Sequence, residues 1–506
     1  MGGEGKGLEA GAAGSSPRAR RVVIVGGGIT GLATAYRLLK ATRDGQANQS
    51  SPSIEVTVIE GRPELGGNIR TERTEGLIID GGPDAFVVTK PHATALCKEL
   101  GLGDRLIGTT AENRKVYILH RGRLHALPEG MVLTVPTRIL PMVQTRLLSW
   151  PAKARMALDL VLPRQRDAAD ESIGQFMRRR LGREVTERIA EPLLGGIFAG
   201  DVEALSARST FPQLVELEER HGSLIKGVLA QRRARAAAAG GTSSSSTAPS
   251  AFFALIGGMG ELIETLAAEV TRRGGGLRTS TRIDRIVAGD PTPRFRVEAR
   301  GPSGEPEVIE ADDLVLALPA YAAAHVVREL DADLASILRA VPYESTATVF
   351  LGYRRGDVPH PLDATGLIIP KTERRRALAA TFVTSKWEHR APPGVTLLRV
   401  FLGGHRDPSA LELSDDGLLR LARDELAALI GVKAEPFFTR VFRHERGSAQ
   451  PVVGHADRMR RARERTAAHP GLHLAGAAFE GVGIPDCVRQ AGEVASRILD
   501  KHDERR

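Results

Sequence analysis

A continuous apolar run marks the first predicted strand of this chain. RVVIV at residues 21–25 gives way, through GGGITG, to the helical periodicity of LATAYRLLK, which ends at residue 40. A polar stretch at 41–53 then separates this segment from a second apolar run, IEVTVIE, at 54–60. A strand, a glycine turn, a helix and a second strand in this order predict a βαβ unit.

The middle of the chain has a helical pattern. Residues 131–230 carry apolar positions at helical spacing, interrupted by four prolines between 136 and 163. Residues 231–250, QRRARAAAAGGTSSSSTAPS, are of low complexity and predict a mobile surface insertion.

The C-terminal half predicts a mixture of strands and helices. A helical segment at 257–275 precedes three strand-like runs, and strand-like runs return at 343–405 before a helix at 412–430. HLAGAAFEGVGIPDCVRQAGEVASRIL, at 473–499, again reads as a strand end, a glycine turn and a helix with an apolar face. A unit of this kind usually begins a cofactor-binding domain, so its position at the end of the chain needs an explanation.

Composition narrows the classes of protein that the pattern allows. The chain has 506 residues, 42% hydrophobic and 26% charged, which predicts a globular protein of two or three domains. The sequence contains no run of about 18 apolar residues, so we expect no membrane-spanning helix. Residues 1–19 lack the apolar core of a signal peptide, and we expect them to form a disordered leader. Cys97 and Cys487 are the two cysteines and form no CxxC motif, so we expect neither a metal site nor a disulfide framework.

The charge points to an anionic partner. The formal net charge is +9, which favours an acidic substrate or an anionic membrane surface. The sequence contains no zinc-finger spacing, no RNP motif and no Lys-rich tail, so we expect no nucleic-acid partner.

A GxGxxG motif lies between the first predicted strand and helix. Gly26 allows the tight turn, Gly28 allows the backbone to approach a pyrophosphate, and Gly31 lets the helix pack on the strand. The N-terminus of the helix then faces the phosphates. The residues that we expect to contact the dinucleotide here are Gly26, Gly27, Gly28, Ile29, Thr30 and Gly31.

Glu60 ends the second predicted strand, where a carboxylate can bind the ribose 2′-hydroxyl. It follows Gly31 by 29 residues, more than the usual spacing of about 20, and the polar stretch at 41–53 accounts for the excess. An acidic residue here disfavours the 2′-phosphate of NADP. This motif alone leaves NAD and FAD open.

A second glycine pair follows Glu60. GRPELGGNIRT at 61–71 and IDGGPDAF at 79–86 resemble the flavin-containing amine oxidase superfamily, in which the first stretch wraps the FAD pyrophosphate and the flavin edge. The resemblance implies that FAD is the cofactor and is bound noncovalently. It further implies that the cofactor contacts Gly61, Gly66, Gly67, Asn68, Arg70, Gly82, Pro83, Asp84, Ala85 and Ile283.

The same resemblance explains the C-terminal unit. In this superfamily the FAD domain is assembled from separate pieces of chain, and the last helix directs its N-terminus at the flavin. Cofactor contacts are therefore expected at Ala475, Gly476, Val482, Gly483 and Ile484. Cys487 lies nearby, and we interpret it as a packing residue rather than as a covalent link to the flavin.

Within the superfamily, the chain resembles the oxygen-dependent protoporphyrinogen oxidase family most closely. The resemblance extends from about residue 20 to the C-terminus, and GGIFAGDVEALSARSTFPQL at 195–214 discriminates best, since amine oxidases and phytoene desaturases do not resemble it. The implied reaction converts protoporphyrinogen IX to protoporphyrin IX in haem biosynthesis. It takes three two-electron oxidations, with O₂ as acceptor and H₂O₂ as product.

The resemblance also implies residues for the substrate. Arg114 would pair with a propionate, Gly196 would place its backbone against the macrocycle, and Ile368 and Phe401 would sandwich it. We expect no side-chain acid–base catalyst, because the flavin N5 can accept hydride from a methylene bridge. We expect no metal.

The predicted fold is α/β, with a discontinuous Rossmann-like FAD-binding domain, a mixed α+β substrate domain and a helical membrane-associating domain. The expected boundaries are 1–19 for the leader, 20–107, 251–318 and 468–503 for the FAD-binding domain, 108–126 and 319–467 for the substrate domain, 127–230 for the helical domain and 231–250 for the insertion.

The helical domain mixes apolar and basic residues in a way that suits an anionic membrane surface. PTRILPMVQTRLLSWPAKARMALDLVLPRQR, at 136–166, carries both kinds, and the family resemblance implies peripheral attachment. We therefore expect the cytoplasmic side of the cell membrane. The alternative is a soluble helical subdomain of a cytoplasmic protein. The resemblance also allows a homodimer.

Three alternatives stay open. A coproporphyrinogen III oxidase that forms coproporphyrin III would share these motifs and handle four propionates instead of two. An amine oxidase or carotenoid desaturase would share the FAD motifs, but an aromatic content of 4% and the 195–214 stretch argue against it. The chain could also be a noncatalytic flavin-binding partner of a membrane complex.

Overall fold

The computed structural model describes residues 18–43, 54–132, 134–165, 169–238, 250–290 and 292–503. Most of the expected leader, residues 1–17, lies outside the described residues, and so does most of the expected polar stretch, residues 44–53.

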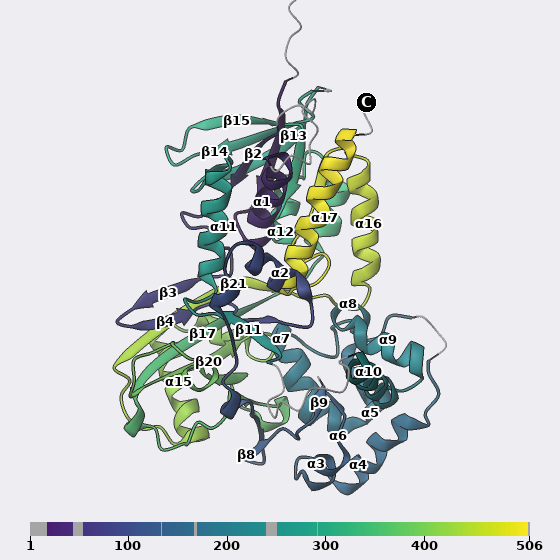
Figure 1. The fold of residues 1–506 in the computed structure, drawn as a ribbon, viewed down its shortest axis with the longest axis vertical. Helices are drawn as coiled ribbons and strands as arrows, with labels where there is room; N and C mark the ends of the chain where they lie inside the picture. The colour runs from purple at the N-terminus through teal and green to yellow at the C-terminus, as the bar shows by residue number, and fades with distance from the viewer. Residues whose placement is uncertain are drawn as a thin grey trace, which may run out of the picture.

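A five-stranded parallel sheet forms the upper part of the molecule in Figure 1, and it joins the two ends of the chain. Its strand order is β12 (Gly276–Arg278), β2 (Ile54–Ile59), β1 (Arg20–Val25), β16 (Asp313–Leu316) and β22 (Leu472–Leu474). Because side chains alternate along a strand, Val22 and Ile24 face one side of the sheet while Val23 and Val25 face the other. The expected βαβ unit is present: α1 (Ile29–Arg43) connects β1 to β2.

Each face of this sheet is covered. On the first face pack α1, α2 (Pro91–Glu99), α11 (Gly260–Arg272) and α17 (Ile484–Asp503). On the second pack the antiparallel strands β13 (Arg282–Ala288), β14 (Phe295–Arg300) and β15 (Pro306–Ala311), with α12 (Ala320–Val326), α13 (Ala332–Arg339) and α16 (His455–Ala467).

Helix α17 shows why the C-terminal segment folds back onto the N-terminal one. Five of its apolar residues recur at helical spacing and are buried against the core that α1 shares, and each large buried aliphatic side chain contributes about 1.5–3 kcal/mol. They are Val488, Ala491, Val494, Ala495 and Ile498. The sequence-based prediction of a helix with one buried face is confirmed.

A mixed seven-stranded sheet forms a second layer. Its order is β21 (Phe438–Ala449), β17 (Tyr343–Arg354), β20 (Val395–Gly403), β19 (Ala379–Phe382), β18 (Gly366–Ile368), β7 (Val116–His120) and β8 (Arg123–Ala126). Only the β18–β7 pair is parallel among these described strands. One face packs on α15 (Asp415–Ile430), through residues such as Leu398, Val400 and Leu402. From the other face, Arg399 of β20 donates to the backbone carbonyls of Gly81 and Gly82.

Short elements connect the two sheets. They are the hairpin β3 (Thr71–Thr74) and β4 (Leu77–Asp80), the strands β5 (Phe86–Val87), β6 (Leu106–Gly108) and β11 (Phe252–Leu255), and the helix α14 (Val383–Lys386).

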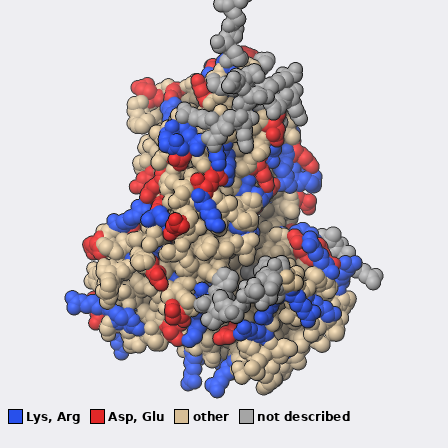
Figure 2. Space-filling model, viewed as in Figure 1, with Lys and Arg blue, Asp and Glu red and all other residues tan. Residues whose placement is uncertain are grey.

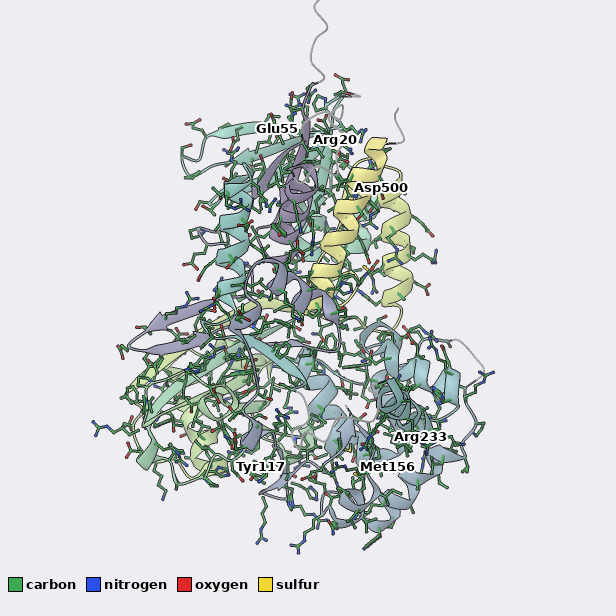
Figure 3. All side chains as sticks on the ribbon, in the orientation of Figure 1. Arg20, Glu55, Tyr117, Met156, Arg233 and Asp500 are labelled. Atoms are coloured by element: carbon green, nitrogen blue, oxygen red, sulfur yellow. The ribbon has the colours of Figure 1, made fainter. Side chains whose placement is uncertain are left out.

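The third part is helical, as the pattern at 131–230 predicts. After β9 (Met131–Val132) and β10 (Val135–Pro136) come α3 (Ile139–Gln144), α4 (Trp150–Ala157), α5 (Ile173–Leu181), α6 (Arg183–Val185), the π-helix η4 (Thr186–Gly195), α7 (Gly196–Phe198), α8 (Ala207–Thr210), α9 (Pro212–His221) and α10 (Leu224–Ala238). Figure 3 places Met156 in this part, Tyr117 in the seven-stranded sheet, and Arg20, Glu55 and Asp500 in the upper part.

Two boundaries differ from the sequence-based expectation. Residues 320–339 and 455–467, expected in the substrate domain, form α12, α13 and α16, which pack on the five-stranded sheet because their apolar faces complete its second core. The expected insertion at 231–250 is also different at its start, because α10 continues to Ala238. Residues 239–249 lie outside the described residues.

No helix in the described part of the chain combines the length and the hydrophobicity that crossing a bilayer requires.

Candidate active site

The GxGxxG glycines have different surroundings at the end of β1. A Cβ at Gly26 would lie 2.3 Å from the carbonyl oxygen of Ala317, and a Cβ at Gly31 would lie 1.9 Å from that of Gly26. At Gly28 the nearest atom would be the Gly67 Cα at 4.0 Å. The chain itself therefore requires glycine at positions 26 and 31, whereas at Gly28 the free space faces away from the protein.

The second glycine pair packs directly on the first. The Gly66 N–H donates to the Gly27 carbonyl over 2.8 Å, and Gly28 and Gly66 form a β-bridge. A Cβ at Gly67 would lie 4.0 Å from a guanidinium nitrogen of Arg62, whose half-exposed side chain lies beside this glycine surface. Backbone without side chains, a helix N-terminus and a guanidinium together suit a pyrophosphate.

Glu60 closes the same site at the end of β2. Its buried carboxylate accepts hydrogen bonds from the backbone N–H groups of Gly27 (2.9 Å) and Arg62 (3.0 Å). The Thr281 N–H donates to the Glu60 carbonyl over 2.9 Å, which brings the start of β13, with Ile283, to this end of the site. The lone pairs that remain on the carboxylate suit a ribose hydroxyl.

The segment at 81–85 forms the other end of the site. A Cβ at Gly82 would lie 1.7 Å from the Asn68 carbonyl oxygen, so this glycine packs against the loop of the second glycine pair. Pro83 is exposed, and Asp84 and Ala85 are half-buried. Asn68 is exposed, and its side-chain amide donates to the Gly447 carbonyl over 3.0 Å.

Three donors hold the carbonyl oxygen of Gly81. They are the Thr348 hydroxyl (3.0 Å), the Arg399 guanidinium (3.0 Å) and the His444 Nε2 (2.9 Å). Arg399 also donates to the Gly82 carbonyl over 2.8 Å. Three strands of the seven-stranded sheet thus hold the loop that follows β4.

Asp84 is ionised in spite of its burial. Burial acts to raise the pKa of its carboxyl, but the charges of Lys386 and Arg399, with hydrogen bonds from Lys386 (2.7 Å) and the Trp387 indole (2.9 Å), outweigh it and hold that pKa below its usual range. Burial, with the nearby charges of Arg399 and Arg70, lowers the pKa of His444, so this ring is neutral at pH 7.

The C-terminal segment completes the site. Gly476 has φ +135°, and a Cβ there would meet only the Leu318 carbonyl oxygen at 3.9 Å and the Thr30 hydroxyl at 4.0 Å. Ala475 and Ile484 are buried in the core beside α1, while Val482 and Gly483 are half-buried. Burial raises the pKa of the Cys487 thiol to about 11, so it is protonated at neutral pH.

The expected substrate residues Ile368 and Phe401 share one row of the seven-stranded sheet. Ile368 pairs with Ala379, and Ala379 pairs with Phe401, so the two larger side chains lie two strands apart, roughly 10 Å, with an alanine between them. All three are half-buried, and Phe401 pairs on its other side with Thr348, which contacts the Gly81 loop. The row therefore forms an apolar surface on the face directed toward the expected flavin site.

The other two expected substrate residues, Arg114 and Gly196, lie outside this row. Arg114 is half-buried at the end of the turn before β7, and Ile118 of β7 pairs with Ile368. Arg114 precedes the strand by two residues, and at no more than about 3.3 Å per residue its backbone lies within roughly 13 Å of that level. Gly196 follows η4, and a Cβ there would meet no atom within 4 Å.

Sequence reasoning missed several residues of this site. Arg62 was predictable from its place in the glycine loop, but Arg399, His444, Lys386 and Trp387 carry no local signal, since each contacts a segment about 300 residues or more away. No cluster of metal-binding side chains occurs among the residues that the structure describes.

The residues present fit FAD. The glycine surface with Arg62 suits the pyrophosphate, Glu60 suits the ribose, and the 81–85 and 475–484 segments leave backbone accessible at the opposite end, where a flavin would lie.

The comparisons with known proteins agree. A family model described as flavin containing amine oxidoreductase matches residues 29–499. The chain is 35% identical to a coproporphyrinogen III oxidase of Bacillus subtilis (strain 168), covering 95% of this chain and 98% of the relative. It is 30% identical to a protoporphyrinogen oxidase of Macaca fascicularis, with the same coverage.

Solved structures add the fold. A chain from Exiguobacterium sp. 255-15 superposes with a TM-score of 0.79 at 32% identity, covering 95% of this chain and 99% of that one. Putrescine oxidase, at 17% identity and a TM-score of 0.64, shares the fold and covers 95% and 99%. The expected α/β flavoenzyme fold and the expected FAD are confirmed, and the chain is an oxidoreductase that belongs to the flavin containing amine oxidoreductase family.

Proposed function

We propose that this protein oxidises a porphyrinogen to the corresponding porphyrin in haem biosynthesis, with O₂ as electron acceptor. The observation that carries the proposal is the apolar row of Ile368, Ala379 and Phe401 beside the Gly81–Gly82 loop. Two large apolar side chains roughly 10 Å apart, with a small residue between them, suit the edge of a flat, apolar macrocycle.

The residues of the chain orient the reactants. Bound FAD supplies a two-electron acceptor, and because the overall conversion removes six electrons and six protons, three O₂ become three H₂O₂. Arg399 and His444 hold the loop at 81–82 in place, and the apolar row excludes water from the macrocycle. Arg114 suits a propionate, which it can bind through two parallel hydrogen bonds.

Two porphyrinogens are candidates. The relatives from Bacillus subtilis and Propionibacterium freudenreichii, both 35% identical, are named coproporphyrinogen III oxidases, which favours coproporphyrinogen III as the first candidate for this chain. Protoporphyrinogen IX, the substrate expected from the sequence, is the second candidate, and the macaque relative supports it.

A fluorescence assay tests the proposal. The FAD-loaded protein is supplied in air with each porphyrinogen in parallel, and the rate of autoxidation is subtracted. We expect rapid red fluorescence with H₂O₂ release from at least one, and the larger kcat/KM identifies the substrate. Flavin that neither compound reduces under anaerobic conditions would refute the proposal.

We further propose that the helical part binds an anionic membrane surface on the cytoplasmic side. Large apolar side chains are exposed on α3, α4 and the segment that follows, including Ile139 (84%), Trp150 (68%) and Val161 (77%). Basic side chains such as Arg138 and Lys153 accompany them. In Figure 2 the bottom of the molecule, over α3 and α4, is broadly uncharged with basic residues beside it.

Co-sedimentation with vesicles of anionic lipid at low salt tests the membrane proposal. Ile139→Glu should reduce the bound fraction several-fold, because a charge replaces an inserted side chain. Val308→Glu is the matched control, since Val308 is also exposed but lies on β15 of the upper part. Equal loss in both variants, or no binding by the unmodified chain, would contradict it. A homodimer stays a prediction.

A further inference from the structure

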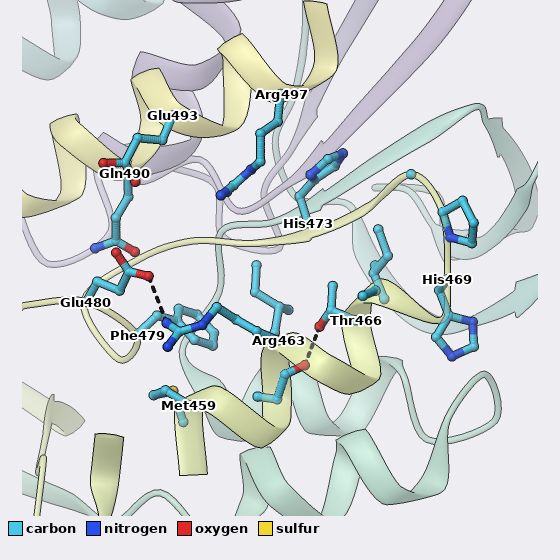
Figure 4. Close-up of a pocket in the computed structure, with 16 residues that line it drawn as sticks. Met459, Arg463, Thr466, His469, His473, Phe479, Glu480, Gln490, Glu493 and Arg497 are labelled. Carbon is cyan, nitrogen blue, oxygen red and sulfur yellow. Dashed lines mark hydrogen bonds and ion pairs between the residues drawn. The ribbon is translucent and has the colours of Figure 1, made fainter. Parts of the chain in front are cut away.

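A cavity separate from the expected flavin site, here called the second cavity, lies between α16, β22 and α17. It is at the open edge of the five-stranded sheet. It has a volume of about 230 Å³, and none of its lining residues is among the expected cofactor or substrate residues. Engineered cavities of about 150 Å³ bind benzene, so the space is sufficient for a single-ring molecule. Figure 4 shows side chains of α17 on one side of the β22 segment and side chains of α16 on the other.

A buried amide nitrogen lines this cavity without a protein partner. Gln490 is 4% exposed and lines the cavity, and its Nε2 has no hydrogen-bond partner among the described residues. His473 also lines the cavity, but its Nε2 lies 3.5 Å from the Asp313 carboxylate and is directed to that group. A buried donor left unsatisfied is costly, so the Gln490 amide indicates a polar group that it binds.

The orientation of Gln490 is fixed by its other end. Its Oε1 accepts a hydrogen bond from the Gly476 N–H over 3.1 Å, which directs its NH₂ group away from that loop. Gly476 is one of the residues expected at the flavin, so the Gln490 side chain connects the cavity with the flavin-binding loop.

The charges around the cavity favour a ligand with an anionic end. Glu480 is paired with Arg463 (2.9 Å) and Glu493 with Arg489 (2.6 Å), while Arg497, which also lines the cavity, has no ion pair among the described residues. In Figure 4 Arg497 extends from α17 toward the β22 segment. A guanidinium and a buried amide together are donors that suit a carboxylate.

Most of the remaining lining is apolar, and its polar side chains, Thr466 and His469, have partners in the Ala462 carbonyl and in Asp331. Met459 and Ala462 come from α16, Leu472 and Leu474 from β22, and Phe479 from the loop that follows. We propose that this cavity is a binding site for a small aromatic or aliphatic carboxylate, separate from the flavin site, with the carboxylate on Gln490 and Arg497 and the apolar body against Phe479 and α16.

Benzoate is the probe for this site. Its binding to the FAD-loaded full chain is measured by calorimetry and by ligand-observed NMR, with neutral benzamide as the comparison ligand. We expect saturable binding of benzoate and binding of benzamide that is about tenfold weaker, because the anion interacts with Arg497. Absence of saturable benzoate binding would overturn the proposal.

Three variants locate the binding. Ala462→Leu fills the cavity and should abolish it, and Arg497→Met should weaken it several-fold, whereas Arg461→Met on the outer side of α16 should leave it unchanged. Flavin content and thermal stability verify that each variant is folded, and the exposed Arg497 keeps the test valid if Ala462→Leu is unstable. Benzoate binding that neither cavity variant alters would place it elsewhere, as at the flavin, and would also overturn the proposal.

Discussion

At the scale of single residues, the glycines of the GxGxxG motif have different roles, one in folding and another in cofactor binding. Gly31→Ala places a methyl 1.9 Å from the Gly26 carbonyl oxygen and should destabilise the protein by about 1–3 kcal/mol. Gly28→Ala meets no close protein atom, so the apo-protein should keep its stability while FAD binds about tenfold more weakly, or ~1.4 kcal/mol. Thermal unfolding of the apo-proteins and FAD titration measure the two effects, and equal stability losses in both variants would contradict this division.

Glu60 should contribute to FAD affinity through its charge. Glu60→Ala removes the acceptor for Gly27 and Arg62 and a carboxylate for the ribose, at about 1.5–3 kcal/mol for a charged hydrogen bond. The expected loss of affinity is roughly tenfold or more, measured by flavin fluorescence. Glu64→Ala, in the same loop but exposed, is the control. If both variants bind FAD as the unmodified chain does, the role of Glu60 is wrong.

Arg114 should act on substrate binding rather than on the oxidation step. If its guanidinium pairs with a propionate in both the ground state and the transition state, Arg114→Ala should raise KM about tenfold with little change in kcat. Steady-state fluorescence kinetics with the preferred porphyrinogen provide the measurement, and Arg123→Ala, exposed on the adjacent strand β8, provides the control. An unchanged KM would remove Arg114 from the site.

The site residues that the sequence predicted and those that it did not differ in the sequence separation of their contacts. The glycines and Glu60 act through a local unit of strand, turn and helix, whose chemistry is visible in about 40 residues. Arg399 and His444 instead contact Gly81 across more than 300 residues. Within their own strands both read as ordinary polar positions, so only the packing of the two sheets gives them a role.

At the scale of elements, α16 was assigned to the wrong part of the molecule for a similar reason. The helix is strongly charged, and only a narrow stripe that includes Met459 and Ala462 is buried. The apolar stripe alone does not determine which hydrophobic core the helix packs on, because it could be buried against any apolar surface. In the structure it packs with α13 on the five-stranded sheet, where it also forms one wall of the second cavity.

The first residue of α16 should make stability depend on pH. Burial, helped by the charge of Arg458, lowers the pKa of His455 to about 4, against about 6.5 when unfolded. Between these values the unfolded state binds a proton that the folded state does not, so the free energy of unfolding falls as pH falls from 6.5 to 4. This group contributes about 1.4 kcal/mol per pH unit at most.

The measurement is urea unfolding across that pH range. His455→Gln should show a flatter dependence than the unmodified protein, whereas His389→Gln, at an exposed position, should not. Equal slopes for all three proteins would contradict the account of His455.

At the scale of the whole molecule, the flavin site depends on nearly the full length of the chain. Its segments come from 26–31, 60–70, 82–85 and 475–484, and two strands of the five-stranded sheet lie more than 400 residues apart. The sequence predicted this discontinuous assembly through its resemblance to a family, because hydrophobic pattern alone does not pair a first strand with a last helix. The helical part and the seven-stranded sheet then supply the apolar surface that a macrocycle requires.

Removal of FAD should therefore be reversible and should weaken the whole protein. Cys487, the cysteine near the flavin end, is buried with its pKa raised to about 11, and a neutral thiol is a poor nucleophile. Acid precipitation should leave a colourless pellet and yellow supernatant, and Cys487→Ala should behave identically.

Because FAD binds only the folded chain, free FAD at 100 times its Kd should raise the free energy of unfolding of the refolded apo-protein by about 2.7 kcal/mol in urea titrations. A pellet that keeps its colour would establish a covalent bond, and an unfolding midpoint that does not respond to added FAD would mean that the four segments assemble without it.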